Sequence, residues 1–189
     1  GYMAVGYTAL LLDLDTQRML REVYGATPAA ALPVITFANG LSIHFNGEEI
    51  KLIHLPHGHT DGDSAVWFTG SNVIHMGDEY VVGGFPFIDL NSGGSVEGLI
   101  DNHANILAQI PDNIRVIPGH GGLSTKAEMA SWIEGVRTTA KIVTDQMVAG
   151  KTLAAIIEQG LPEQYASWGM GFINEAAYIT AVYTSSANP

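Results

Sequence analysis

The first half of the chain carries short runs of apolar and β-branched residues that are separated by turn residues. The pairs Asn39-Gly40 and Asn46-Gly47 separate the first three runs, and Asn-Gly is a strong signal for a tight hairpin turn. This pattern predicts an antiparallel meander with short connections. The expected strands are residues 32–37, 41–45, 49–55, 64–68 and 72–76.

The second half has the periodicity of helices. Apolar residues recur at steps of three and four from Val96 to Ile110, which predicts a helix with one stripe in the core. Thr125 and Glu128 have the spacing of a capping box, which opens a long helix that Gly150 ends. The other expected elements are a strand at 113–118, helices at 153–159 and 175–183, and, near the start, a strand at 2–12 and a helix at 16–24. Together they predict an α/β (α+β) fold with helices layered on a sheet.

Composition and charge limit the classes of partner. The chain has 189 residues, 47% of them hydrophobic, which suits one globular domain over residues 1–189. Its formal net charge of −11 repels phosphate backbones and anionic lipids, so we expect no nucleic acid and no membrane as partner. Because it has no cysteine, any bound metal must be held by His, Asp or Glu.

Four of the histidines have an ordinary structural interpretation. His44, His54 and His75 lie in expected strands, and His103 lies on the apolar stripe of the helix at 96–110. Single histidines in such positions usually belong to the fold, and we interpret these four in that way.

His59, Asp78 and His120 form a different pattern. Each follows an expected strand and each lies beside a glycine, so the three would gather at one rim if the strands share a sheet. Imidazole and carboxylate ligands suit Zn²⁺ better than Ca²⁺, which prefers oxygen alone. The alternative is that Asp78 caps a turn and the two histidines are plain loop residues.

Three segments resemble metal-binding motifs of the metallo-β-lactamase superfamily: "LPHGHTDGDSAVWF", "VIHMGD" and "VIPGHG", in this order. The resemblance covers residues 32–185 and implies an αββα sandwich that binds one or two zinc ions at the sheet rim. It implies that His59 completes a three-histidine site, that Asp78 bridges two metals, and that His120 binds the second metal.

The same resemblance implies a zinc-dependent hydrolase, in which metal-activated water attacks an ester, thioester, lactone or β-lactam. Asp78 would be the catalytic bridging ligand. His57, Asp61 and Asp63 are candidates to support the ligands from outside the metal's own shell.

The first motif of the superfamily, H-x-H-x-D-H, is missing. His57, His59 and Asp61 match part of it, but Gly62 stands where its last histidine should be, and a strand follows where a helix is expected. We therefore expect a domain that is incomplete at its N-terminus. Such a fragment would expose the inner face of its sheet, which predicts a homodimer or the exchange of elements with a second copy. The alternative function is a non-catalytic scaffold or dimerising interaction module of the same fold.

Substrate choice is expected to lie in the segment 81–95, where Phe85 and Phe87 offer apolar contact or pack on the sheet edge. No Lys or Arg lies between Lys51 and Arg115, so this segment offers no cation to a substrate carboxylate. The compartment is open, although the resemblance slightly favours the periplasm or secretion.

Overall fold

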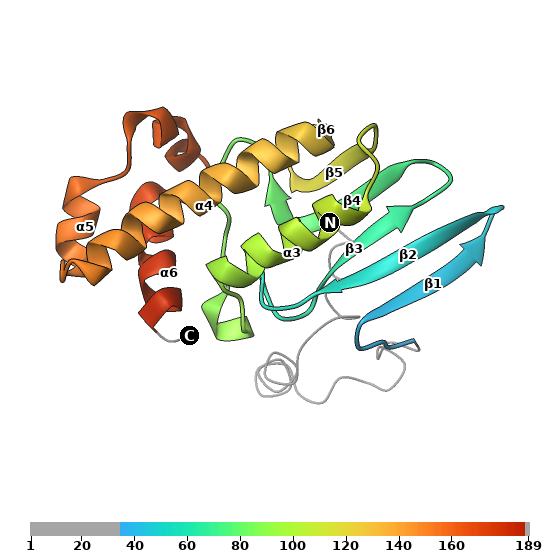
Figure 1. The fold of residues 1–189 in the computed structure, drawn as a ribbon, viewed down its shortest axis with the longest axis horizontal. Coiled ribbons are helices and arrows are strands. Elements are labelled where there is room, and N and C mark those ends of the chain that lie inside the picture. Colours follow the sequence, from blue (N-terminus) through green and yellow to red (C-terminus); the bar gives the residue numbers. More distant parts are fainter. Residues whose placement is uncertain (1–34, 188–189) are drawn as a thin grey trace.

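The computed structural model describes residues 35–187, shown as a ribbon in Figure 1. The elements expected at 2–12 and 16–24 lie outside the described residues. In chain order the elements are β1 (Gly40–Phe45), β2 (Glu48–Leu55), β3 (Asp63–Phe68), β4 (Val73–Val81), η2 (Leu90–Ser92), α3 (Val96–Gln109), β5 (Arg115–His120), β6 (Ser124–Thr125), α4 (Lys126–Val148), α5 (Leu153–Gln159), η3 (Glu163–Met170) and α6 (Glu175–Ala187).

The strands form one six-stranded sheet in the order β1-β2-β3-β4-β5-β6. All neighbours are antiparallel except β4 and β5, which are parallel because α3 connects them. The hairpin between β1 and β2 turns at Asn46 and Gly47, whose φ angles of 51° and 80° are those that the Asn-Gly pair predicts. The meander from β1 to β4 is therefore confirmed.

The first expected strand, 32–37, is wrong over its described part. Residues 35–37 are not in a strand, and β1 is the edge of the sheet. β-branched residues favour a strand only where a partner strand offers hydrogen bonds and packing, and no described strand lies beyond β1.

β4 is longer than the sequence predicts. β4 continues to Val81, with a shift in its pairing register with β5 at Gly77. The φ angle of Gly77 is 57°, a left-handed conformation that glycine adopts without strain. Asp78 therefore lies inside β4 and not after it, and His120 is the last residue of β5.

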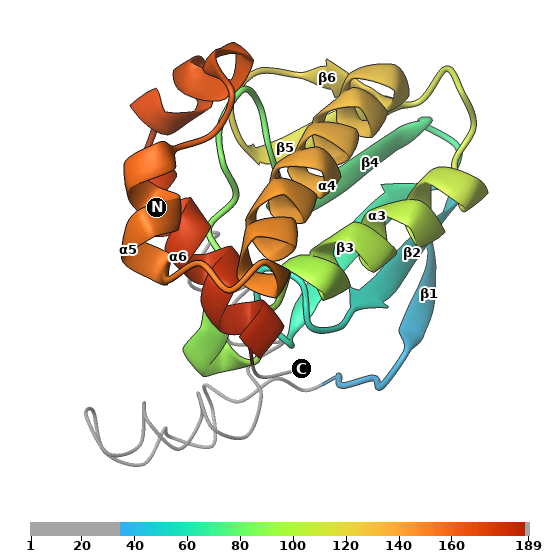
Figure 2. The same cartoon turned by 60° about the vertical axis from the view of Figure 1, so that its left-hand side comes forward.

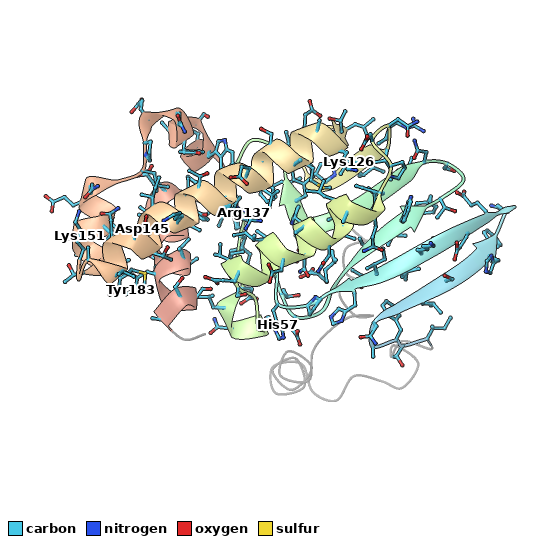
Figure 3. All side chains as sticks on the ribbon, viewed as in Figure 1. His57, Lys126, Arg137, Asp145, Lys151 and Tyr183 are labelled. Carbon is cyan, nitrogen blue, oxygen red and sulfur yellow. The ribbon has the colours of Figure 1, made fainter. Side chains whose placement is uncertain are left out.

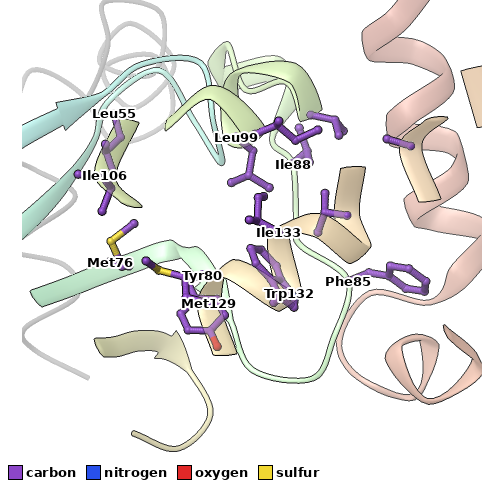
Figure 4. Close-up of a cluster of buried hydrophobic side chains, with 14 of the residues drawn as sticks. Leu55, Met76, Tyr80, Phe85, Ile88, Leu99, Ile106, Met129, Trp132 and Ile133 are labelled. Carbon is purple, nitrogen blue, oxygen red and sulfur yellow. The ribbon is translucent and has the colours of Figure 1, made fainter. Parts of the chain in front are cut away.

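Helices α3 and α4 lie side by side over one face of the sheet (Figures 1 and 2). The capping box at the start of α4 is confirmed: Thr125 Oγ1 accepts the Glu128 backbone N–H, and the Glu128 carboxylate accepts the N–H of Thr125. The core between helices and sheet contains the buried side chains in Figure 4, among them Leu55, Met76, Leu99, Ile106 and Met129.

Segments α5, η3 and α6 gather at the end of the sheet away from β1 (Figure 1). The short helix η3 was not expected from the sequence, and Trp168 within it stacks near Trp132 of α4, with ring centroids 6.4 Å apart. No helix within residues 35–187 combines the length and the apolar character needed to cross a bilayer.

The sheet face opposite α3 and α4 carries both apolar and polar side chains. The strand register places these apolar side chains on it: Leu41, Ile43, Phe45, Ile50, Leu52, Val66, Phe68, Val73 and Ile117. The polar side chains on the same face are Glu48, His54, Ser64, His75 and Arg115. Ile43 and Phe45 are exposed. Among the described residues, the apolar side chains open to solvent on this face are thus those of the edge strand β1.

His103 gives the fold a predictable pH dependence. It is fully buried between Tyr80 and Trp132, and desolvation lowers its pKa to about 4 although Nδ1 donates a hydrogen bond to the Leu99 carbonyl. The unfolded chain therefore binds a proton on His103 at pH values where the folded chain does not. We expect the free energy of unfolding to fall as the pH drops from about 6.5 to about 4, by up to about 1.4 kcal/mol per pH unit from this group.

Urea unfolding at several pH values measures this effect, with His103→Leu as the comparison. The variant removes the titrating group, so its stability should be flatter over the same pH range. Equal slopes in the two proteins would contradict the assignment.

Candidate metal centre

Asp78 lies between two imidazole rings that come from different parts of the chain. His59 Nε2 is 3.7 Å from Asp78 Oδ2, and His120 Nε2 is 3.4 Å from Asp78 Oδ1. His59 belongs to the loop after β2, Asp78 to β4 and His120 to the end of β5. The parallel pairing of β4 with β5 and the antiparallel pairing of β2, β3 and β4 bring these three positions to one end of the sheet.

The ring of His59 is held in one orientation. Its Nδ1 donates a hydrogen bond to the Phe87 carbonyl oxygen at 2.8 Å, which requires the proton to be on Nδ1 because a carbonyl only accepts. In the neutral ring, Nε2 therefore presents a lone pair toward the Asp78 carboxylate. Two lone pairs that face the same space are satisfied by a cation between them, and metal-binding histidines commonly have their other nitrogen bonded to a carbonyl in this way.

Two glycines allow the His59 loop and the end of β5 to lie close to β4. A Cβ on Gly119 would overlap Asp78 Oδ1 and the carbonyl of Gly77, and a Cβ on Gly58 would overlap the Glu79 carboxylate. Any other residue at these two positions would push the loop of His59 or the end of β5 away from Asp78.

Glu79 is a functional candidate that the sequence patterns do not indicate. It is fully buried, its Oε1 accepts the backbone N–H of His59 at 2.8 Å, and its Oε2 accepts a hydrogen bond from Asn102 Nδ2 at 3.2 Å. Burial raises the pKa of its carboxyl well above the ordinary value, and the charge of Asp63 adds to this, while the two hydrogen bonds oppose it. Glu79 thus ties the loop of His59 to α3. Its sequence signal is an acidic residue directly before the buried Tyr80.

The structure does not bring the supporting candidates to the three ligand positions. His57 Nδ1 pairs with Asp61 Oδ1 at 3.1 Å on the exposed side of the loop, where Figure 3 labels His57. Asp63 Oδ2 accepts hydrogen bonds from the backbone N–H and the hydroxyl of Thr60 at 2.6 and 2.7 Å. Asp63 therefore shapes the loop that carries His59, whereas His57 and Asp61 pair with each other.

The other histidines have contacts of a structural kind. His54 Nε2 bonds the carbonyl oxygen of Asp61 at 2.7 Å, and His75 Nδ1 accepts the N–H of Gly77 at 3.0 Å. His103 is in the core and His44 is exposed on β1. Their interpretation as residues of the fold agrees with these positions.

The two aromatic residues of the segment 81–95 differ in their exposure to solvent. Phe85 is buried and stacks on Tyr178 of α6 with ring centroids 4.4 Å apart, so it packs in the core and not on the sheet edge. Phe87 is exposed, and its ring lies 5.6 Å from the ring of His59. Only Phe87 is therefore available to a ligand at the centre.

The chemical types of the three candidate ligands, His59, Asp78 and His120, suit a divalent metal ion. Two imidazoles and a carboxylate are ligands of zinc and similar ions. Within the described residues, however, no three His, Asp or Glu side chains converge on a single point where they could hold an ion. The geometry explains this, because each histidine approaches a different oxygen of Asp78. Each of the two Asp78 carboxylate oxygens therefore has one imidazole beside it.

Comparison with known proteins supports the fold. No family model and no curated protein sequence matches this chain. Among solved structures, a metallo-beta-lactamase from Pontibacter korlensis aligns with a TM-score of 0.51 and 13% identity over 63% of this chain and 54% of its own. A double mutant of the sec-alkyl sulfatase PisA1 aligns with a TM-score of 0.63 and 14% identity over 84% of this chain and 26% of its own.

A third structure, TTHA1623 in a di-iron-bound form, has 27% identity over 63% of this chain and 59% of its own, with a TM-score of 0.47. The chain thus spans about half the length of the first and third structures and about a quarter of the second. The similarity to the first two structures confirms the expected α/β fold class. The described residues have a fold of the metallo-β-lactamase type, which is also the fold of the sec-alkyl sulfatase PisA1.

Proposed function

We propose that this protein is a zinc-dependent hydrolase. The observation that carries the proposal is the Asp78 carboxylate placed between His59 Nε2 and His120 Nε2, with the His59 ring fixed by the Phe87 carbonyl. When bound there, a zinc ion would supply Lewis acidity and lower the pKa of a coordinated water toward neutrality.

Each residue of the proposed centre would have a separate role. His59 and His120 would each hold one side of the centre, and Asp78 would bridge the two sides with its separate oxygens. Glu79 would keep the His59 loop in place through the backbone N–H of His59. Because about half of the Asp78 side chain is exposed, its oxygens also remain accessible to the hydrogens of an incoming water.

The proposed substrates are esters, thioesters, lactones and β-lactams, whose carbonyl carbons all accept attack by water. Ionic recognition of a substrate carboxylate is not supported, because no Lys or Arg occurs between Lys51 and Arg115. A β-lactam therefore has no advantage over a neutral ester.

Hydrolysis of p-nitrophenyl acetate, a thioester, a lactone and a chromogenic β-lactam tests the proposal. The protein is assayed after removal of metal by a chelator and again after dialysis against zinc. We expect at least one substrate to be hydrolysed only after zinc is restored. Calcium is the matched control and should not restore activity, since it prefers oxygen ligands. Equal rates with and without zinc, or no hydrolysis by zinc-loaded protein, would contradict the proposal.

A non-catalytic scaffold or interaction module is the second candidate function. The observation that favours it is the absence, within residues 35–187, of a group of three converging ligands. The same assay separates the two candidates, because a module would hydrolyse none of the substrates with or without zinc.

We also propose a second copy of the chain as partner. The exposed Ile43 and Phe45 lie on the same side of the edge strand β1, on the sheet face that α3 and α4 leave uncovered, and neighbouring exposed apolar residues tend to mark protein interfaces. A homodimer, or exchange of elements between two copies, would bury these two side chains. Sedimentation should then give twice the chain mass of 20.1 kDa, and Phe45→Glu should shift it to the monomer. A monomer at micromolar concentration would contradict this proposal.

A further inference from the structure

An exposed pair of aromatic rings extends outward from the candidate centre. The Phe87 ring lies 5.6 Å from the His59 ring and 6.2 Å from the ring of Phe172, which it meets edge to face at 84°. Phe87 is 44% exposed and Phe172 is 92% exposed. The pair is therefore an apolar surface that begins at the imidazole of His59.

Phe87 is fixed to the centre by its backbone as well as by its ring. The carbonyl oxygen of Phe87 accepts the hydrogen bond from His59 Nδ1. Its neighbours in the chain are also fixed, because Phe85 and Ile88 are buried in the core. The position of the Phe87 ring relative to the metal ligands is thus set by the fold.

Phe172 is presented by a segment that is anchored elsewhere. It follows η3, where Trp168 packs edge to face against Phe85 with ring centroids 5.6 Å apart, and the Trp168 carbonyl accepts the N–H of Phe85. Met170, in the same segment, is 86% exposed. The segment is thus anchored and yet holds two large apolar side chains in solvent. Neighbouring exposed apolar residues of this kind tend to mark a binding surface.

The charges near the two rings disfavour an anionic ligand group. The sequence has no Lys or Arg from 52 to 114, and Lys126, Arg137 and Lys151, labelled in Figure 3, lie along α4 or just after it. Asp61 and Asp89 lie in the loops near the centre and carry the opposite charge. A neutral, apolar group is what this surface favours.

We propose that Phe87 and Phe172 form a subsite for the hydrocarbon part of a neutral ester or lactone, such as an acyl chain or an aromatic ring. This inference rests on the proposed hydrolase function and specifies its substrate class. The bond that breaks is the acyl carbon to oxygen bond, with water supplying the hydroxyl to the acid and the proton to the alcohol. The subsite binds the apolar chain while the carbonyl lies at the centre.

The test compares p-nitrophenyl acetate with p-nitrophenyl hexanoate on zinc-loaded protein and on Phe172→Ala. We expect the variant to raise the KM for the hexanoate by about 3- to 10-fold, the range that loss of one aromatic contact covers. The KM for the acetate should not change. Val148→Ala, which truncates another exposed apolar residue at the end of α4, is the matched control and should leave both substrates unchanged.

Binding of the neutral fluorescent probe N-phenyl-1-naphthylamine gives a readout that does not depend on hydrolysis. We expect Phe172→Ala to weaken its binding and Val148→Ala to leave it unchanged. Unchanged probe binding and an unchanged KM for the hexanoate would overturn the subsite. A change in the sedimentation mass of Phe172→Ala would also overturn it, since the surface would then be an interface with a second copy. If neither ester is hydrolysed, probe binding alone decides whether an apolar site exists here, and the proposed function fails only if the thioester, the lactone and the β-lactam are not hydrolysed either.

Discussion

Replacement of Gly119 by alanine is expected to weaken zinc binding by about 100-fold, the upper end of what loss of a supporting contact costs a metal site. A Cβ at this position would overlap Asp78 Oδ1 and the backbone carbonyl of Gly77. The carbonyl belongs to β4 and cannot move away as a flexible side chain could. The end of β5 must therefore shift, and His120 moves away from Asp78 with it.

Gly122→Ala is the matched control, because nothing lies within 4 Å of a Cβ built there. Competition with a chromophoric zinc chelator measures the dissociation constants of both variants. The control should bind zinc as the unmodified protein does. Equal affinities in the two variants would show that the approach of β5 to Asp78 does not matter for the metal.

Tyr178→Ala is expected to lower the free energy of unfolding by about 3–5 kcal/mol, as other aromatic-to-alanine changes in cores do. The Tyr178 ring is fully buried and stacks on Phe85 at an angle of 11°. Its hydroxyl donates to the Val136 carbonyl at 3.1 Å and is 2.9 Å from Thr139 Oγ1. Truncation therefore leaves a cavity between α4, α6 and the segment that carries Phe87, and it leaves Thr139 without this partner.

Two further variants separate the contributions at this position. Tyr178→Phe keeps the ring and should cost about 1 kcal/mol, the net value of a hydrogen bond. Phe172→Ala removes an aromatic ring that is almost fully exposed and should change stability by less than about 0.5 kcal/mol. Urea unfolding of the three variants checks the order, and a cost for Tyr178→Ala as small as that for Phe172→Ala would contradict the packing.

Local patterns predicted most of the regular structure. The Asn46-Gly47 turn, the period of α3 and the capping box of α4 are features of short segments, and each one acts through hydrogen bonds or periodicity within a few residues. These elements appear where the sequence places them. The strand expected at 32–37 does not continue into the described residues, because a strand also needs a neighbour that only the whole sheet provides.

The details of the candidate centre depended on contacts between distant segments. The sequence placed His59, Asp78 and His120 near the ends of strands, and the structure brings them together in pairs. The bulge at Gly77, which keeps Asp78 inside β4, could not be read from a glycine alone. Glu79 and Phe172 were missed for the same reason, since their partners lie 20 and 85 residues away in the chain.

Elemental mass spectrometry of protein purified without chelator tests the central claim most directly. We predict about one or two zinc ions per chain, because each oxygen of Asp78 has one imidazole beside it. We also predict that Asp78→Asn loses the metal, whereas His44→Asn, which changes an exposed histidine on β1, keeps it. Protein that contains no zinc even after dialysis against it, or Asp78→Asn that keeps as much zinc as the unmodified protein, would contradict the proposed metal centre.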